Sequence, residues 1–298
     1  MSSVAAQVPA STDSFNGYNL RIGDSDKKKI WGGKAIATDE GNYVKTLQEF
    51  LITVGVLQEA ADGGFGKKTQ TALQRFQWNA KNISYKLKDK SIMELAPVFN
   101  GDVNGILDEQ TKKAIARWKK NLTVCTGDLV RIKEAKYTNI TFSSSLRKID
   151  SPYVNTGELV VSKALIPYLD EMNNQAVTLK IKLHVNQALR EQGVPPKGAV
   201  VTPATRSQHY LGHALDINMV DGNSWNSSTD FKNKKETDNA KKFIKKMKEF
   251  GMRWGGDFAP VDTPHFDFQI PADSFAYEAK FFFNQRSIAL KSMIPLID

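Results

Sequence analysis

The sequence predicts an α+β protein built from two folded parts. Apolar residues recur at helical spacing in residues 40–77, whereas helix-like and strand-like segments mix from about residue 158 onward. The chain has 298 residues, a length that suits two domains or one large one. Hydrophobic residues make up 41% and charged residues 24%, which is ordinary globular composition.

The first 25 residues are rich in Ser, Asn and Gly, lack periodicity and predict a flexible lead-in. They carry neither a basic segment nor an apolar core of the kind found in Sec signal peptides. No run approaches the roughly 18 apolar residues of a membrane span. We therefore expect a protein made in the cytoplasm without a Sec signal, with no membrane insertion.

Two short helices are expected in residues 42–57 and 67–77, joined by a turn at residues 62–64. A weaker copy of the turn and second helix occurs 42 residues later, at residues 100–120. The helix that should precede this copy is poorly developed in residues 79–100, so the copy is expected to be either degenerate or an embellishment of the first. The matching positions are Gly63, Phe65, Thr69, Ala72, Leu73 and Phe76 with Gly105, Leu107, Thr111, Ala114, Ile115 and Trp118.

This segment resembles the peptidoglycan-binding domain 1 family, a small three-helix module. The resemblance rests on Val44-x-x-Leu47-Gln48 and on Asp62-Gly63-x-Phe65-Gly66-x-x-Thr69-x-x-Ala72-Leu73-x-x-Phe76-Gln77. It implies a helical wall-binding domain over residues 26–122 with bacterial peptidoglycan as its partner. The matching residues are glycines of a tight turn and apolar core positions, so they do not identify the residues that contact the wall.

Residues 123–155 are expected to form a connector with short strands, and residues 156–298 a second domain. Helices are expected at 162–174, 177–192, 236–250 and 273–289, and strands at 198–202, 214–220, 253–254 and 265–270. The single cysteine, Cys125, excludes an intrachain disulfide and a cysteine-based zinc site. It is expected to be a half-buried apolar residue.

The formal net charge of +9 favours polyanionic partners, either nucleic acid or an anionic cell envelope. The lysines occur in several runs, and those at 241–248 alternate with apolar residues as the solvated face of an amphipathic helix. No nucleic-acid-binding motif accompanies the charge, so a nucleic-acid partner is not expected.

Three of the four histidines lie beside carboxylates in two short segments, 207–216 and 254–266. A hydrolytic zinc needs three nitrogen or oxygen ligands, an open position for water and a base nearby. Two histidines and a carboxylate from these segments could supply the ligands. The other histidines are interpreted as structural: His213 at the surface or behind the ligands, and His184 on a helix.

The pattern Ser207-x-His209-x-x-Gly212-x-Ala214-x-Asp216, followed by Asp262-x-x-His265, resembles the D-alanyl-D-alanine carboxypeptidase and L-alanyl-D-glutamate endopeptidase family. This zinc peptidase family includes VanX- and VanY-type enzymes and phage endolysins. The resemblance implies the α+β fold shared with the Hedgehog signalling domain, and Zn²⁺ held by His209, Asp216 and His265. It also implies Asp262 as general base.

The same resemblance suggests Arg206 as the residue that stabilises the oxyanion, although the family's usual insertion between this arginine and Ser207 is missing. Trp254-Gly-Gly-Asp257-Phe258 resembles a Trp-Gly-Gly-Asp-Trp segment of the L-alanyl-D-glutamate branch. Ser207, Trp254 and Asp257 are therefore candidate substrate-binding residues.

These patterns favour a monomeric zinc endopeptidase that cuts the L-alanyl-D-glutamate bond of the peptidoglycan stem and acts on the cell wall. A phage endolysin that lyses its host would suit the absence of a Sec signal. The alternatives are a D-alanyl-D-alanine carboxypeptidase and a secreted antibacterial effector. A different class is a catalytically inactive wall-binding structural protein, such as a virion component.

Overall fold

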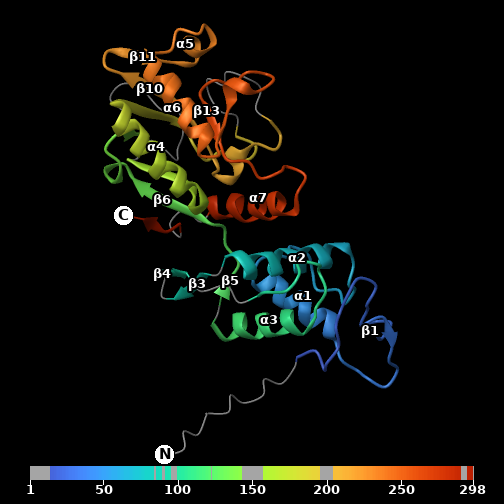
Figure 1. Cartoon of the computed structure of the whole chain (residues 1–298). Helices are drawn as coiled ribbons and strands as arrows, with labels where there is room; N and C mark the ends of the chain where they lie inside the picture. The colour runs from blue at the N-terminus through green and yellow to red at the C-terminus, as the bar shows by residue number, and fades with distance from the viewer. Residues whose placement is uncertain are drawn as a thin grey trace, which may run out of the picture. The chain divides into compact units, whose positions relative to one another are not determined.

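The computed structural model describes residues 14–83, 85–88, 91–94, 99–121, 123–142, 157–194, 204–289 and 294–297. The chain divides into two compact units, Met1–Thr126 and Gly127–Asp298 (Figure 1). The first unit is mainly helical and the second mixes helices with sheets, so the α+β prediction with a helical N-terminal domain is confirmed. None of the described helices is long and apolar enough to cross a membrane.

Three helices form the centre of the first unit, with short strands around them. The elements are β1 (Ile30–Trp31), β2 (Lys34–Ala35), α1 (Tyr43–Thr53), α2 (Lys67–Asn82), β3 (Tyr85–Lys88), β4 (Ser91–Glu94), α3 (Glu109–Asn121) and β5 (Thr123–Val124). On α2, Phe76 packs edge-on against Phe50 of α1 at 5.0 Å and against Trp118 of α3 at 5.2 Å, measured between ring centroids. The middle helix therefore carries the core shared by the other two.

A buried glutamine clamps the turn that leads into α2. The side-chain amide of Gln48 on α1 donates to the carbonyl of Gly64 at 3.0 Å and to Thr69 Oγ1 at 3.1 Å. Its Oε1 accepts the backbone N–H of Gly63 at 2.9 Å. The amide also donates to Oδ1 of Asp62 at 2.9 Å, so one side chain binds four polar groups at a helix start where no side-chain cap is present.

The same clamp recurs at the turn before α3, and Gln77 of α2 supplies it. Its amide donates to the carbonyl of Ile106 at 2.9 Å and to Thr111 Oγ1 at 3.0 Å, and its Oε1 accepts the N–H of Gly105 at 2.8 Å. Helix α2 is therefore the second helix of the first copy and the first helix of the second. The expectation of a degenerate copy is wrong, because no helix within residues 79–100 is needed.

The N-terminal segment is folded from residue 14 onward, so the prediction of a flexible lead-in through residue 25 is wrong there. Phe15, Leu20 and Asp24 are buried, and the N–H of Leu107 donates to the Leu20 carbonyl at 2.8 Å. The Asp24 carboxylate accepts the N–H groups of Gly32 and Gly33, at 2.8 and 2.9 Å. The polar composition of this segment suggests flexibility, but the hydrogen bonds that Asp24 accepts from the glycine turn hold the segment in place. Residues 1–13 lie outside the described residues.

Within its described residues, the second unit contains two sheets and three longer helices. Its strands are β6 (Leu129–Lys133), β7 (Ile140–Thr141), β8 (Glu158–Ser162), β9 (Ile181–Gln187), β10 (Ala214–Asp221), β11 (Ser224–Asn226), β12 (Arg253–Trp254), β13 (His265–Asp267) and β14 (Leu296–Ile297). Its α-helices are α4 (Ile166–Leu179), α5 (Ser228–Lys232), α6 (Asp238–Glu249) and α7 (Phe275–Ile288), and its 3-10 turns are η1 (Glu134–Lys136), η2 (Lys163–Leu165), η3 (Gln208–Leu211) and η4 (Gly255–Asp257).

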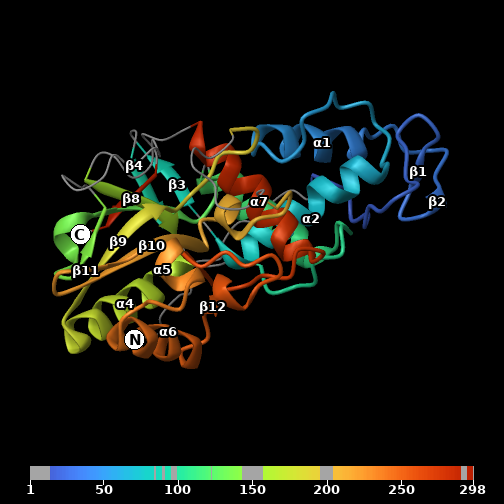
Figure 2. The same ribbon diagram turned by 90° about the horizontal axis from the view of Figure 1, so that it is seen from above.

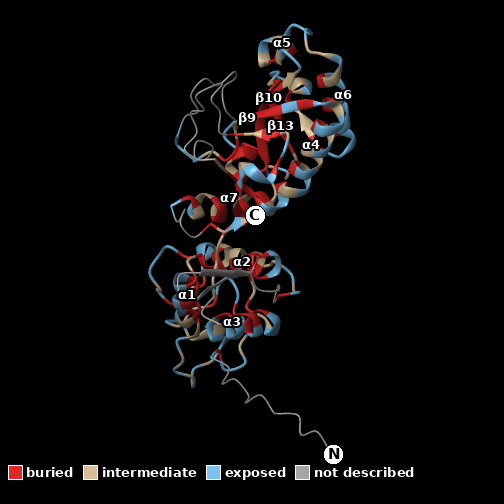
Figure 3. Cartoon of the chain, turned by 90° about the vertical axis from the view of Figure 1, so that its left-hand side faces the viewer, coloured by how far each residue is buried: buried red, intermediate tan, exposed pale blue. Residues whose placement is uncertain are grey.

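The larger sheet has the strand order β12-β13-β10-β9-β7, with β11 also paired to β10. All of its pairs are antiparallel except β7 with β9. Helices α4 and α6 lie side by side along one face (Figure 2), and Phe243 of α6 packs on Phe266 of β13. Burial is concentrated in β9, β10 and β13 (Figure 3). The smaller sheet has the order β14-β6-β8.

Two sequence expectations for this unit are wrong. The helix expected at 177–192 ends at Leu179, and after the left-handed residue Lys180 the chain continues as β9. Apolar Ile181, Leu183 and Val185 alternate with the polar residues Lys182, His184 and Asn186, which is the sequence pattern of a strand. The 123–155 connector is likewise not separate, because β6 and β7 belong to the two sheets of the second unit. The strand expected at 198–202 lies outside the described residues.

Candidate metal centre

The three predicted ligands reach one point because of a tight turn and a strand pair. His209 lies on η3, which begins at Ser207, whose Oγ accepts the N–H of His209 at 3.3 Å. The turn ends at Gly212 with φ of 71°, where an added Cβ would lie 2.6 Å from the backbone nitrogen of Ser162. Strand β10 then carries Asp216 directly opposite His265 of antiparallel β13.

The donor atoms of these three residues form a nearly equilateral triangle. Nε2 of His209 lies 3.2 Å from Oδ1 of Asp216 and 3.1 Å from Nδ1 of His265, and Nδ1 of His265 lies 3.2 Å from the same Oδ1. Two ligands of tetrahedral zinc, each about 2.0–2.1 Å from the ion, lie about 3.3–3.4 Å apart. All three residues are buried. The donor set and its spacing therefore fit zinc.

Hydrogen bonds on the far side of each ring orient the histidines. Nδ1 of His209 lies 2.6 Å from the carbonyl oxygen of Ala188, so it carries the proton and leaves the Nε2 lone pair for a metal. Nε2 of His265 lies 2.9 Å from Oδ2 of Asp267, which leaves Nδ1 for the metal. We assign both tautomers from these acceptors.

Charged partners hold the carboxylates. Arg253 donates to both oxygens of buried Asp267, at 2.8 and 2.7 Å, and so fixes the carboxylate that orients His265. Arg190 donates to Oδ2 of Asp216 at 2.8 Å and leaves Oδ1 facing the histidines. Every ligand thus has a partner on the side away from the triangle, as metal ligands in proteins commonly do.

Arg190, rather than Arg206, is the arginine that the structure brings to the ligands. It follows β9, in the segment that the sequence analysis assigned to a helix, and was missed for that reason. Arg206 is exposed, and its guanidinium donates to the carbonyl of Ala272. The alternation of apolar and polar residues in β9 could have indicated a strand. A strand at that position pairs with β10 and so brings Arg190, which follows it, close to Asp216.

Asp262 lies on the turn that leads into β13. Its carbonyl accepts the N–H of His265 at 3.0 Å, and its own N–H donates to the carbonyl of Gly255 at 2.8 Å. An added Cβ at Gly255 would lie 2.0 Å from the Asp262 carbonyl, so only glycine permits this approach. Burial and then the charge of Asp216 raise the pKa of Asp262 against the opposing effect of His265, which suits a carboxyl that exchanges protons.

The ligands themselves have strongly shifted pKa values. Burial lowers the pKa of His209, with Asp216 partly opposing this effect. Burial would raise the pKa of Asp216, but the charges and hydrogen bonds of His209 and His265 hold it well below its usual range. Burial also disfavours the charged form of His265, yet hydrogen bonds to Asp216 and Asp267 raise its pKa to about 9. Without a metal, a proton is therefore held at His265.

The other two histidines are buried and are not members of the triangle. His213 has Nε2 2.6 Å from Nζ of Lys280, and its pKa is lowered to about 3, first by burial and then by that ammonium group. The expectation of a surface position is therefore wrong, whereas a position behind the ligands fits. His184 lies on β9 rather than on a helix, with Nδ1 3.2 Å from Thr141 Oγ1.

One face of α7 holds the turn that carries His209. Nζ of Lys280 lies 2.8 Å from Asp128 and 3.0 Å from Ser162 Oγ in the cluster that also contains His213. Neighbouring α7 side chains bind backbone carbonyls of the turn: Tyr277 to Ser207 at 3.0 Å, Asn284 to Leu211 at 2.8 Å and Gln285 to Tyr210 at 2.7 Å. The position of η3 is therefore fixed from behind by a helix that approaches from the C-terminal part of the chain.

The three candidate substrate-binding residues lie in different places. Ser207 is buried and caps η3. Trp254 is opposite Phe266 in the β12–β13 pair, so it faces α6, while His265 faces the other side. Asp257 forms an ion pair with Lys248 of α6 at 2.6 Å. The structure therefore does not bring Trp254 and Asp257 to the metal ligands.

Known proteins match both units. Residues 201–268 match the family described as D-alanyl-D-alanine carboxypeptidase, and residues 40–81 match the putative peptidoglycan binding domain. An L-alanyl-D-glutamate peptidase of Listeria phage A118 is 30% identical over 93 residues, which cover 30% of this chain and 31% of the phage protein. The chain thus spans about a third of that curated relative's length. The resemblance expected from the sequence is confirmed: a segment similar to peptidoglycan-binding domains precedes one similar to the D-alanyl-D-alanine carboxypeptidase family.

Proposed function

We propose that this chain is a zinc-dependent peptidase that hydrolyses a peptide bond in the stem of peptidoglycan. The triangle of His209, Asp216 and His265 carries the proposal, because its 3.1–3.2 Å edges fit zinc and each ligand is oriented from behind. The peptidoglycan-binding match supports the wall as the substrate. The second matched segment contains all three ligands and Asp262.

Zinc bound to these residues would supply a Lewis acid and activate a water molecule for attack. Asp262 takes a proton from the attacking water and delivers it to the nitrogen of the leaving amine, in keeping with its raised pKa. Arg190 takes the role suggested for Arg206, since its guanidinium lies beside Asp216 and can stabilise negative charge that develops on the carbonyl oxygen.

For the bond, we favour L-alanyl-D-glutamate, supported by the phage relative and by the Trp254–Phe258 segment. The alternative is removal of the terminal D-alanine, which the description of the matched family supports. For the biological role, we favour a phage endolysin that lyses its host, with a secreted antibacterial effector as the alternative.

Digestion of purified sacculi with and without a chelator tests this function, with the released muropeptides identified by mass spectrometry. New L-alanine carboxyl ends and D-glutamate amino ends support the endopeptidase, whereas loss of terminal D-alanine alone supports the carboxypeptidase. Equal activity after complete zinc removal would refute the zinc mechanism.

A His265→Ala variant separates an enzyme from a wall-binding structural protein. We expect this variant to lose lytic activity, while Asp238→Asn, an exposed change on α6, retains it. Lysis by the His265→Ala variant at the level of the unmodified protein would favour the structural role.

A further inference from the structure

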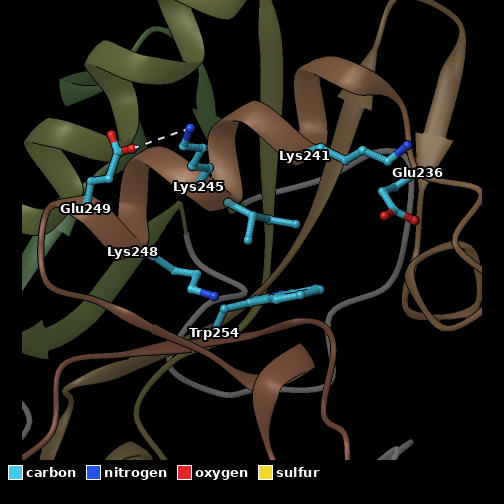
Figure 4. A pocket seen from close by; sticks show the side chains of 7 residues that line it. Glu236, Lys241, Lys245, Lys248, Glu249 and Trp254 are labelled. Carbon is cyan, nitrogen blue, oxygen red and sulfur yellow. Dashed lines mark ion pairs between the residues drawn. The ribbon is translucent and has the colours of Figure 1, made fainter.

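A pocket of about 520 Å³ lies in the second unit between α6 and β12 (Figure 4). Its lining residues are Glu236, Lys241, Ile244, Lys245, Lys248, Glu249 and Trp254. The proposed function does not use this pocket, and its size suits a small ring with substituents rather than an ion alone.

Three lysines of α6 line this pocket. Lys241, Lys245 and Lys248 are spaced by four and then three residues, which places them on the same side of a helix. In Figure 4, Lys248 extends toward Trp254 and Lys241 toward Glu236. The ammonium groups of Lys241 and Lys248 therefore lie toward opposite ends of the pocket, while Lys245 pairs with Glu249.

Two of these lysines have only loose acidic partners, whereas Lys248 pairs closely with Asp257 at 2.6 Å. Lys241 lies 3.6 Å from Asp238, Lys245 lies 3.9 Å from Glu249, and the side chains of both lysines are more than half exposed. Exposed pairs of this kind contribute about 0–1 kcal/mol and are screened by salt. A phosphate or carboxylate bound in the pocket can therefore displace the partners of Lys241 and Lys245.

Trp254 forms a fixed aromatic wall beneath the lysines. Its indole N–H donates to the carbonyl of Thr263 at 2.8 Å, and Phe231 packs edge-on against its ring at 6.1 Å. Ile244 lines the same pocket. A rigid indole face beside cations can stack the C–H face of a sugar ring that carries a negative group.

Glu236 supplies a separate indication of a ligand. Its Oε2 is buried and makes no hydrogen bond to any described residue. Buried carboxylate oxygens are rarely left without a donor. A hydroxyl group of a bound sugar would satisfy this atom.

We propose that this pocket is a second binding site, for a sugar ring that carries a phosphate or carboxylate. The ring stacks on Trp254, a hydroxyl donates to Glu236 Oε2, and the negative group binds the lysines of α6. The site lies on the opposite side of the β12–β13 pair from His265, so it is not the metal centre. Phosphate-bearing wall polymers and the muramic acid of peptidoglycan both contain such a sugar. The choice of cell-wall ligands rests on the proposed function, whereas the existence of the binding site does not.

Indole N–H signals of the full chain, labelled with ¹⁵N-tryptophan, test the proposal. The probes are N-acetylglucosamine 6-phosphate, N-acetylmuramic acid and uncharged N-acetylglucosamine, and the signal lost in Trp254→Phe identifies the reporter. We expect one or both anionic sugars to shift the Trp254 signal, and the uncharged sugar to do so far more weakly. A response to the phosphate alone assigns the site to phosphate-bearing polymers, and a response to the carboxylate alone to muramic acid.

Lysine variants on two faces of α6 provide the matched comparison. Changing Lys241 and Lys245 together to Gln should weaken binding by about five-fold or more, whereas the same change at Lys242 and Lys246, outside the pocket, should leave it nearly unchanged. An absent Trp254 shift, an equal response to the uncharged sugar, or equal weakening by both lysine pairs would overturn the proposal. Since the pocket contains no metal ligand, binding should survive a chelator that abolishes hydrolysis, so failure of one proposal is distinguishable from failure of the other.

Discussion

Replacing Asp267 by Asn should weaken zinc binding without removing any metal ligand. Asp267 accepts the Nε2 proton of His265 at 2.9 Å and two hydrogen bonds from Arg253. An asparagine has one carbonyl oxygen and no charge, so it cannot accept from both partners as the carboxylate does. The ring of His265 then loses the anion that fixes its tautomer and increases its basicity.

Loss of such a partner typically reduces metal affinity by about 10–100-fold, or about 1.4–2.7 kcal/mol. Competition against a chromophoric chelator at neutral pH measures this change in the zinc Kd. The control is Asp238→Asn, which changes a carboxylate that is exposed on α6. A zinc Kd of the folded Asp267→Asn variant within about two-fold of the unmodified protein would refute the claim that this residue supports the metal site.

Three further predictions follow from the same unit. Because the pKa of His265 is raised to about 9, zinc must displace a proton from this residue below that pH. The affinity of the protein for zinc should therefore fall by about ten-fold per pH unit as the pH drops from 9 toward neutrality. A zinc Kd that stays constant over this range would contradict the prediction. Lys280→Met should destabilise the fold by about 3–5 kcal/mol in denaturant titrations, because it leaves the buried charge of Asp128 without its cation; exposed Lys246→Met is the control, and equal effects contradict the reasoning. Asp262→Asn should lower kcat by about 10²–10⁴-fold while zinc content stays near one per chain; loss of zinc from this variant would make the residue a ligand instead.

The cluster of His209, Asp216 and His265 could be predicted from the sequence because its spacing is local. His209 and Asp216 are joined by one turn, and the register of β10 with β13 adds His265. The partners that orient them could not be predicted in the same way. Arg190 was hidden by a strand that was interpreted as a helix, and the burial of His213 depends on Lys280, far along the chain on α7.

The fold of the first unit was predicted only in part, because two features of its repeat recur at different intervals along the chain. The turns recur after 42 residues, from Gly63 to Gly105, while the glutamines that clamp them recur after 29, from Gln48 to Gln77. A search for a single repeat length finds the turns and misses the clamps. The spacing of residues in the sequence does not reveal that α2 packs against both α1 and α3.

The shared helix α2 also determines where the first unit can be shortened. The family match ends at residue 81, which would suggest a natural end point for a wall-targeting fragment. A fragment cut there would strip Trp118 from Phe76 and leave the amide of Gln77 without its acceptors. A fragment that keeps both faces of α2 covered must include α3, and the compact unit that contains both helices ends at Thr126, so the border of sequence similarity and the border of this unit are different places on the chain.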